Sequence, residues 1–225
     1  MPRIAGGRLA GLAAGTMLLL LAAGVSGCGP KAGTLLYFTG LVQPDKTSAA
    51  FDLARKPLLI LVDDDWDLVH PPTARDALVD ALATELRAHK LVERVTTNEE
   101  LAKIRQTEPN FDKRGAREIG RLAKADIVLW LKVVRFTLPD DIEAAVVPCY
   151  FGVSVKVLDA KAAKREDVCL WPKEREGKLV EARVSPHDLQ ACKSAREAHV
   201  AVATALASQV AKLFYEHEEE QQPKQ

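Results

Sequence analysis

The stretch PLLILV, residues 57–62, is a continuous apolar run that ends at three aspartates, Asp63–Asp65. A short run of leucine, isoleucine and valine closed by turn-forming residues is typical of a strand buried on both faces of a sheet. Residues 71–73 (PPT) then open a helix, because proline is tolerated in the first helical turn. Leucines four residues apart predict one apolar face on a helix over 73–90.

Strands and helices continue to alternate downstream. Asn98 and Asp112 are the expected N-caps of two helices, since their side chains can accept hydrogen bonds from free backbone N–H groups. The elements expected in this part of the chain are a short strand at 91–96, helices at 98–106 and 113–124, and a strand at 126–137.

Residues 149–159 alternate between apolar and polar side chains, which is typical of a half-exposed antiparallel strand. Residues 167–171 form its expected partner, 179–184 could add a further short strand, and 188–216 carry the apolar stripe of a long final helix. The order is therefore β-α-β-α-α-β, then a β-hairpin, then a helix. It predicts the α+β (mixed α/β) class, a mixed sheet with helices packed on it.

The amino-terminal segment has the features of an export signal. Arg3 and Arg8 are its only charged residues, and Leu9–Gly27 is an apolar run of mainly leucine, alanine and glycine. Val25-Ser26-Gly27-Cys28 resembles the lipobox of bacterial lipoproteins, in which the cysteine thiol receives a diacylglycerol and the signal is removed. The alternatives are an ordinary signal peptide and an uncleaved anchor.

This resemblance implies a domain organisation. Residues 1–27 would be the signal peptide, 28–56 the lipidated Cys28 with a tether, 57–217 a single globular domain, and 218–225 a disordered tail. Acyl chains on Cys28 would anchor the chain to a membrane of the cell envelope, facing the periplasm. Gly29 favours the outer over the inner membrane, because aspartate at this position favours inner-membrane retention in well-studied Gram-negative cells.

Charge and cysteine content narrow the function classes. Removal of Arg3 and Arg8 leaves a slight excess of acidic residues, so nothing predicts a nucleic-acid partner. Cys149, Cys169 and Cys192 remain after the lipid site. Either one disulfide or three free thiols is compatible with their spacing, which does not match that of a metal site.

Asp63–Asp65, with Asp67 and His70 nearby, is the strongest candidate for chemistry. Carboxylates beyond a buried strand are where α/β proteins place ligand or Mg²⁺ sites, so a metal-dependent hydrolase is one alternative. The other reading is a solvated acidic loop that precedes a helix, and we favour it because no second acidic cluster accompanies the first.

The remaining candidates are single residues. His199 is expected as a hydrogen-bonded, partly buried imidazole, and Cys192 as a nucleophile with His187 or His199 would need an electropositive pocket. Trp130 is expected in the core. Trp66, among acids in a loop, is the candidate partner contact, because aromatic side chains dominate interface hot spots.

Three features resemble one periplasmic lipoprotein fold. They are the strand 57–62 feeding the helix 73–90, the segment 119–129 (IGRLAKADIVL), and the hairpin VSVKVLD (153–159) with its return VCLW (168–171). The fold is that of the curli-secretion (CsgG-like) lipoproteins, the activator lipoproteins of penicillin-binding proteins and the amino-terminal domain of TolB. The resemblance implies a binding or assembly role in the envelope.

The sequence therefore predicts a membrane-anchored lipoprotein that acts as a non-enzymatic protein-binding or scaffold domain, with no cofactor and with an envelope protein as its partner. The alternatives are an oligomeric secretion component of the curli-secretion type and a hydrolase that uses Asp63–Asp65.

Overall fold

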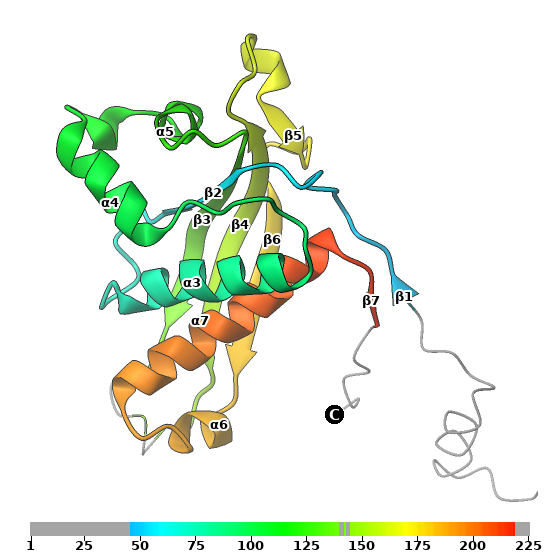
Figure 1. Ribbon diagram of the computed structural model, residues 1–225. Coiled ribbons are helices and arrows are strands. Elements are labelled where there is room, and N and C mark those ends of the chain that lie inside the picture. The colour runs from blue at the N-terminus through cyan, green and yellow to red at the C-terminus, as the bar shows by residue number, and fades with distance from the viewer. Residues whose placement is uncertain (1–45, 140–141, 143–144, 219–225) are drawn as a thin grey trace, which may run out of the picture. The chain divides into compact units, whose positions relative to one another are not determined.

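The computed structural model describes residues 46–139, 142 and 145–218. Its centre is a five-stranded sheet in which β2 and β3 run parallel, β3 and β4 antiparallel, and β4 pairs antiparallel with both β5 and β6 (Figure 1). The strands are β2 (Leu58–Asp63), β3 (Ile127–Thr137), β4 (Cys149–Asp159), β5 (Cys169–Trp171) and β6 (Lys178–Val184), with two-residue strands β1 (Lys46–Thr47) and β7 (His217–Glu218) outside this sheet. The predicted mixed α/β class is confirmed.

Two long helices cover one face of the sheet (Figure 1). The helices are α3 (Thr73–Ala88), α4 (Asn98–Thr107), α5 (Ala116–Leu122), α6 (Pro186–Gln190) and α7 (Ala195–Ala211), with 3-10 turns η2 (Phe111–Lys113), η3 (Arg165–Asp167) and η4 (Lys212–Phe214). Within the described ranges, none of these helices has the length and apolar character needed to cross a bilayer.

The main core lies between the sheet and the helices α3 and α7. Leu82 of α3, Leu206 of α7 and Phe151 of β4 are fully buried in it. The four inward residues of β4 predicted from the alternation, Phe151, Val153, Val155 and Val157, all lie in this core. Burial of apolar surface at ~25 cal/mol per Å² makes this layer the main source of stability.

A smaller core lies on the opposite face, under α5. Leu59 and Val128 from adjacent strands meet Phe111 and Ile119 there. Since Leu58 and Ile60 face the main core, β2 is buried on both sides, as its unbroken apolar run predicts.

Two local predictions between α3 and α5 are wrong. Residues 91–96 form no strand, only a single parallel bridge from Val95 to Leu58. Thr97 rather than Asn98 caps α4, because its hydroxyl accepts from Glu100 N while the Glu100 carboxylate accepts from Thr97 N in a capping box.

The predicted helix 113–124 is also shorter than expected. Asp112 lies inside the turn η2 and caps nothing, and α5 begins after Gly115 without a side-chain cap.

The predicted final helix is interrupted. Ser185 caps α6 and Ser194 caps α7, each accepting a backbone N–H from the residue three positions on. The new cap at Ser194 restarts the helix, so 188–216 are not one element.

The described part of the expected tether packs on the domain. Leu53 is fully buried, and the backbone N–H of Ala50 donates to Leu213 O at 2.7 Å. Residues 46–56 thus pack against η4, directly after α7, rather than only linking the domain to an anchor. The predicted signal peptide, Cys28 and the predicted tail beyond Glu218 lie outside the described residues.

Candidate functional site

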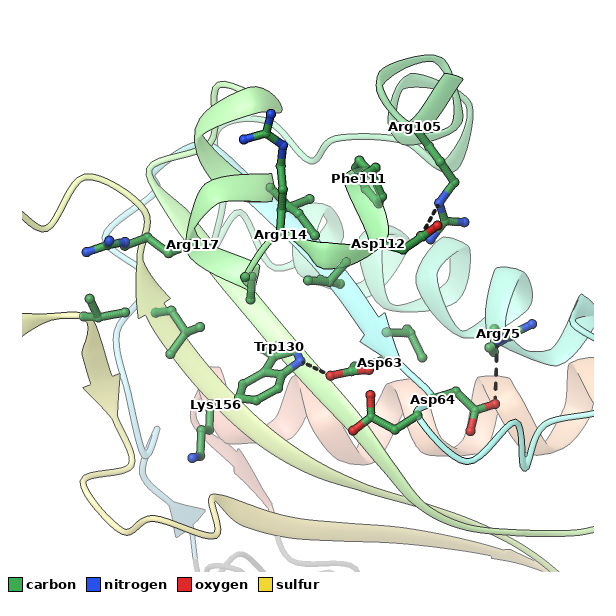
Figure 2. Close-up of a pocket in the computed structure, with 18 of the residues that line it drawn as sticks. Asp63, Asp64, Arg75, Arg105, Phe111, Asp112, Arg114, Arg117, Trp130 and Lys156 are labelled. Carbon is green, nitrogen blue, oxygen red and sulfur yellow. Dashed lines mark hydrogen bonds and ion pairs between the residues drawn. The ribbon is translucent and has the colours of Figure 1, made fainter. Parts of the chain in front are cut away.

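A cleft of about 900 Å³ opens at the carboxyl end of β2 and beside Trp130 in the first half of β3, on the face opposite α7 (Figure 2). Leu61, Trp130 and Leu158 from three strands line its sheet side, and Phe111 and Ile119 line it from η2 and α5. Crevices beyond the carboxyl ends of parallel strands are where open α/β sheets bind ligands. The cleft is therefore the first candidate site.

Asp63 and Trp130 face each other in the cleft (Figure 2), and the indole Nε1 donates to Asp63 Oδ2 at 3.1 Å. Burial raises the pKa of Asp63, and a hydrogen bond and like charge from Asp65 raise it further. The pKa of Asp65 is lowered by its hydrogen bond to Lys132, whose Nζ lies 2.7 Å from Oδ2, and by the hydrogen bond with Asp63. The two carboxyls therefore form an unequal pair in which Asp63 holds a proton more readily.

Asp64 does not join this pair. Its side chain is 1% exposed, and its two oxygens accept from Leu68 N at 2.9 Å and Val69 N at 3.0 Å. Arg75 Nη1 lies 3.6 Å from the same carboxylate. This carboxylate fixes the loop after β2, so the three adjacent aspartates do not converge on one point.

Across the described ranges, no three histidine, cysteine, aspartate or glutamate side chains gather as metal ligands do. Asp67 pairs with His70 at 3.0 Å, and both side chains are exposed.

Most cations around the cleft have partners of their own. Arg105 lies 3.5 Å from Asp112 and over the ring of Phe111, and Arg114 donates to Glu108 at 3.0 Å. In Figure 2 the Arg114 and Arg117 side chains point away from Asp63 and Trp130. The centre of the cleft is thus apolar with one carboxyl pair.

A second surface, here called the open sheet face, extends from the cleft along β3, β4 and β6. The cross-strand register places these residues on the side away from α3 and α7: Trp130, Lys132, Val134, Arg135, Tyr150, Gly152, Ser154, Lys156, Leu179, Glu181 and Arg183. Val134 is 46% exposed and Leu179 62%. On this part of the sheet the helices α3 and α7 cover the other side only, and the loop 175–177 crosses this face at Ser154 and Lys156.

Tyr150 is the centre of a cation–aromatic cluster on this face. The guanidinium carbon of Arg135 lies 4.0 Å from its ring centroid, and that of Arg183 lies 5.9 Å away. Arg135 also pairs with Glu181 at 3.5 Å. Arginine and tyrosine are enriched in the centres of protein interfaces.

The structure separates the two tryptophan predictions. Trp66 is 76% exposed, as a partner contact requires, and that role stays a prediction. Trp130 is partly buried: it packs against the small core, as predicted, and it also lines the cleft.

The three described cysteines are free thiols. Burial raises the pKa of Cys149 to about 12. Burial and the nearby charges of Glu197 and Asp188 raise the pKa of Cys192, which disfavours the thiolate that a nucleophile needs.

His199 departs from its prediction as well. It is buried on α7, parallel to the Phe136 ring at 6.2 Å, and its Nδ1 has no hydrogen-bond partner within the described residues. The expected satisfied imidazole is therefore wrong, since the side chain faces the apolar core.

Sequence reasoning missed the open sheet face and the cation–aromatic cluster. Its signal was present in the polar positions of β4, which alternate with the core residues. Pairing with β6 was needed to bring Arg183 beside Tyr150.

No family model and no curated protein matches the chain. Among solved structures, the PelC dodecamer from Paraburkholderia phytofirmans is 14% identical, with a TM-score of 0.41 over 77% of this chain and 99% of that one. Lipoprotein GNA1162 from Neisseria meningitidis is 14% identical, with a TM-score of 0.38 over 69% and 98%. The hypothetical protein CT253 from Chlamydia trachomatis is 12% identical, with a TM-score of 0.38 over 71% and 97%. These values assign the chain to no family, and the curli-secretion resemblance stays a prediction.

Proposed function

We propose that this chain is a lipid-anchored protein of the cell envelope whose domain binds another envelope protein through the open sheet face. The observation that carries the proposal is the exposed pair Val134 and Leu179 beside the Tyr150 cluster. Apolar side chains flanked by arginine and tyrosine on a rigid sheet match the composition of interface centres. An anchor at Cys28 would confine the search for such a partner to a membrane surface.

The cleft supports a binding role more than a catalytic one. Both carboxylate oxygens of Asp64 accept hydrogen bonds within its own loop. Asp63 and Asp65 share a hydrogen bond, and each has a further partner: Trp130 donates to Asp63, and Lys132 donates to Asp65. A hydrolase that uses Asp63–Asp65 would need Mg²⁺ or Ca²⁺ to bind there. A rise in melting temperature with either ion, lost in Asp63→Asn, would favour that alternative over the proposal.

The anchor is tested by fractionation of cells that express the full chain. The wild type should sediment with outer membranes, begin at Cys28 and carry the mass of acyl chains. Cys28→Ser should leave the membrane fraction without acyl mass. Equal membrane association of both forms would contradict lipid anchoring.

The open sheet face is tested with a photo-crosslinking residue in intact cells. Position 134 is the probe, and position 200 on α7 is its matched control, because Val200 is 43% exposed but lies on the helical side. We expect one envelope protein, identified by mass spectrometry, to crosslink at position 134 and not at 200. The adduct should disappear in the Leu179→Lys background. Equal labelling at both positions would overturn the proposal.

A further inference from the structure

Strand β6 is an edge of the sheet. Its seven residues pair with β4 on one side, and no strand in the described part of the chain lies along its other side. The backbone N–H and C=O groups on that side therefore have no strand partner within the described residues. An exposed edge of this length is a template for pairing between chains.

The side chains of β6 divide cleanly between two faces. Val180, Ala182 and Val184 lie on the side of α7, and Leu179, Glu181 and Arg183 lie on the open sheet face. Adjacent positions of this outer row thus carry opposite charges. Arg135 and Tyr150 already hold these two side chains on this face through the 3.5 Å ion pair with Glu181 and the ring contact of Arg183.

This pattern is self-complementary in one antiparallel register. A two-fold axis at Ala182 places Glu181 opposite Arg183 of the second copy, and Arg183 opposite its Glu181. On the inner face, Val180 then lies opposite Val184 of the second copy. Directly opposed residues of an antiparallel pair share a face. The outer row therefore pairs opposite charges, and the inner row pairs apolar side chains.

Two neighbouring registers also keep the outer row of one copy opposite the outer row of the other, but in them the charges are not complementary. An axis at Glu181 opposes two like charges, and an axis at Val180 places Leu179 opposite a carboxylate. Like charges directly opposite each other destabilise a strand pair. In addition, no carboxylate pairs with Arg183 within the described residues, so a second copy would supply the acid that this arginine lacks.

We infer that the chain forms a two-fold dimer by antiparallel pairing of β6 with β6 of a second copy, with Ala182 on the axis. An isologous contact of this kind joins two sheets into one and removes the free edge from both. The inference concerns self-association and does not depend on the envelope partner proposed above.

Charge reversal tests both the dimer and its register. In Arg183→Glu every cross-strand charge pair becomes acid against acid, and in Glu181→Arg it becomes base against base. Each variant alone should weaken the dimer by at least about tenfold. An equimolar mixture should restore it, because Glu181 of one variant then faces Arg183 of the other, and the two introduced charges face each other.

The experiment uses the full-length chain in detergent, with the detergent-corrected molar mass measured by sedimentation velocity across a dilution series. Circular dichroism of each variant confirms that it folds. We expect dimers for the wild type and the mixture, and monomers for each variant alone. A monomeric wild type, variants that dimerise as the wild type does, or a mixture that stays monomeric would each overturn the inference. A monomer would leave the crosslink at position 134 untouched, so failure of the two proposals is distinguishable.

Discussion

Trp130 Nε1 donates a 3.1 Å hydrogen bond to Asp63 Oδ2 across two strands that are adjacent in space but far apart in sequence. The parallel register opposes Leu61 to Trp130 and Asp63 to Lys132, so all four side chains lie on one face of the sheet. The bond gives the N–H group of a partly buried indole its hydrogen-bond partner, and it holds the Asp63 side chain in the cleft. Asp63 also shares a hydrogen bond with Asp65.

The pKa of Asp63 should fall toward its ordinary value in Asp65→Asn and stay above it, because burial, the largest cause of the rise, remains. Carboxyl ¹³C chemical shifts followed through a pH titration measure this. An unchanged Asp63 pKa in the variant would show that Asp65 plays no part.

The same shift predicts a pH-dependent gain in stability for Asp63→Asn. Because the pKa of Asp63 is raised in the folded chain, folding favours its protonated form. The stability that protonated Asp63 contributes is therefore fully present below its pKa in the unfolded chain. It is lost as the pH rises through its pKa in the folded chain. The amide keeps an acceptor for Trp130 and avoids the buried charge. Urea unfolding should therefore show a more stable variant at pH 7 and no such gain below pH of about 3. Asp65→Asn should behave oppositely at neutral pH, since the pKa of Asp65 is lowered.

Gly120→Ala should destabilise the fold by about 1–3 kcal/mol, because a Cβ there would collide with Val128 Cγ2 and lie 3.0 Å from Ala160 Cβ. Chemical denaturation measures the change. Gly115→Ala is the control, since nothing lies within 4 Å of its Cβ position. Equal effects of the two substitutions would show that α5 does not pack tightly on the sheet.

Leu53→Ala should cost about 2–5 kcal/mol, the usual effect of removing a fully buried leucine side chain. Val146→Ala, at a strongly exposed position, should change the free energy of unfolding by less than about 0.5 kcal/mol. If Leu53→Ala behaved like Val146→Ala, residues 46–56 would be a loose tether after all.

His199→Leu should preserve or increase stability, by up to about 2 kcal/mol, because it removes a buried polar atom that has no partner. His199→Gln, which keeps polar atoms at this position, should give no such gain. The melting temperatures of the two variants decide between these outcomes. A large loss in His199→Leu would show that the imidazole has a partner in the folded chain.

The sequence determined the secondary-structure periods, and with them the fold class. An unbroken apolar run predicted the doubly buried β2, strict alternation predicted the inward row of β4, and leucines four apart predicted α3, because these patterns report local backbone geometry and burial directly. The prediction of a lipid anchor on Cys28 also rests on sequence alone. Caps such as Thr97 and Ser194 were missed, since several neighbouring polar residues could make the same bond.

Only the tertiary structure decided where distant side chains meet. It separated Asp64 from Asp63 and Asp65, brought Trp130 to Asp63 in the cleft, and placed Arg135 and Arg183 beside Tyr150. These arrangements depend on strand order and register, in which a shift of one residue turns every side chain to the other face. Local sequence patterns carry no information on that choice, because it is made by the packing of the whole sheet.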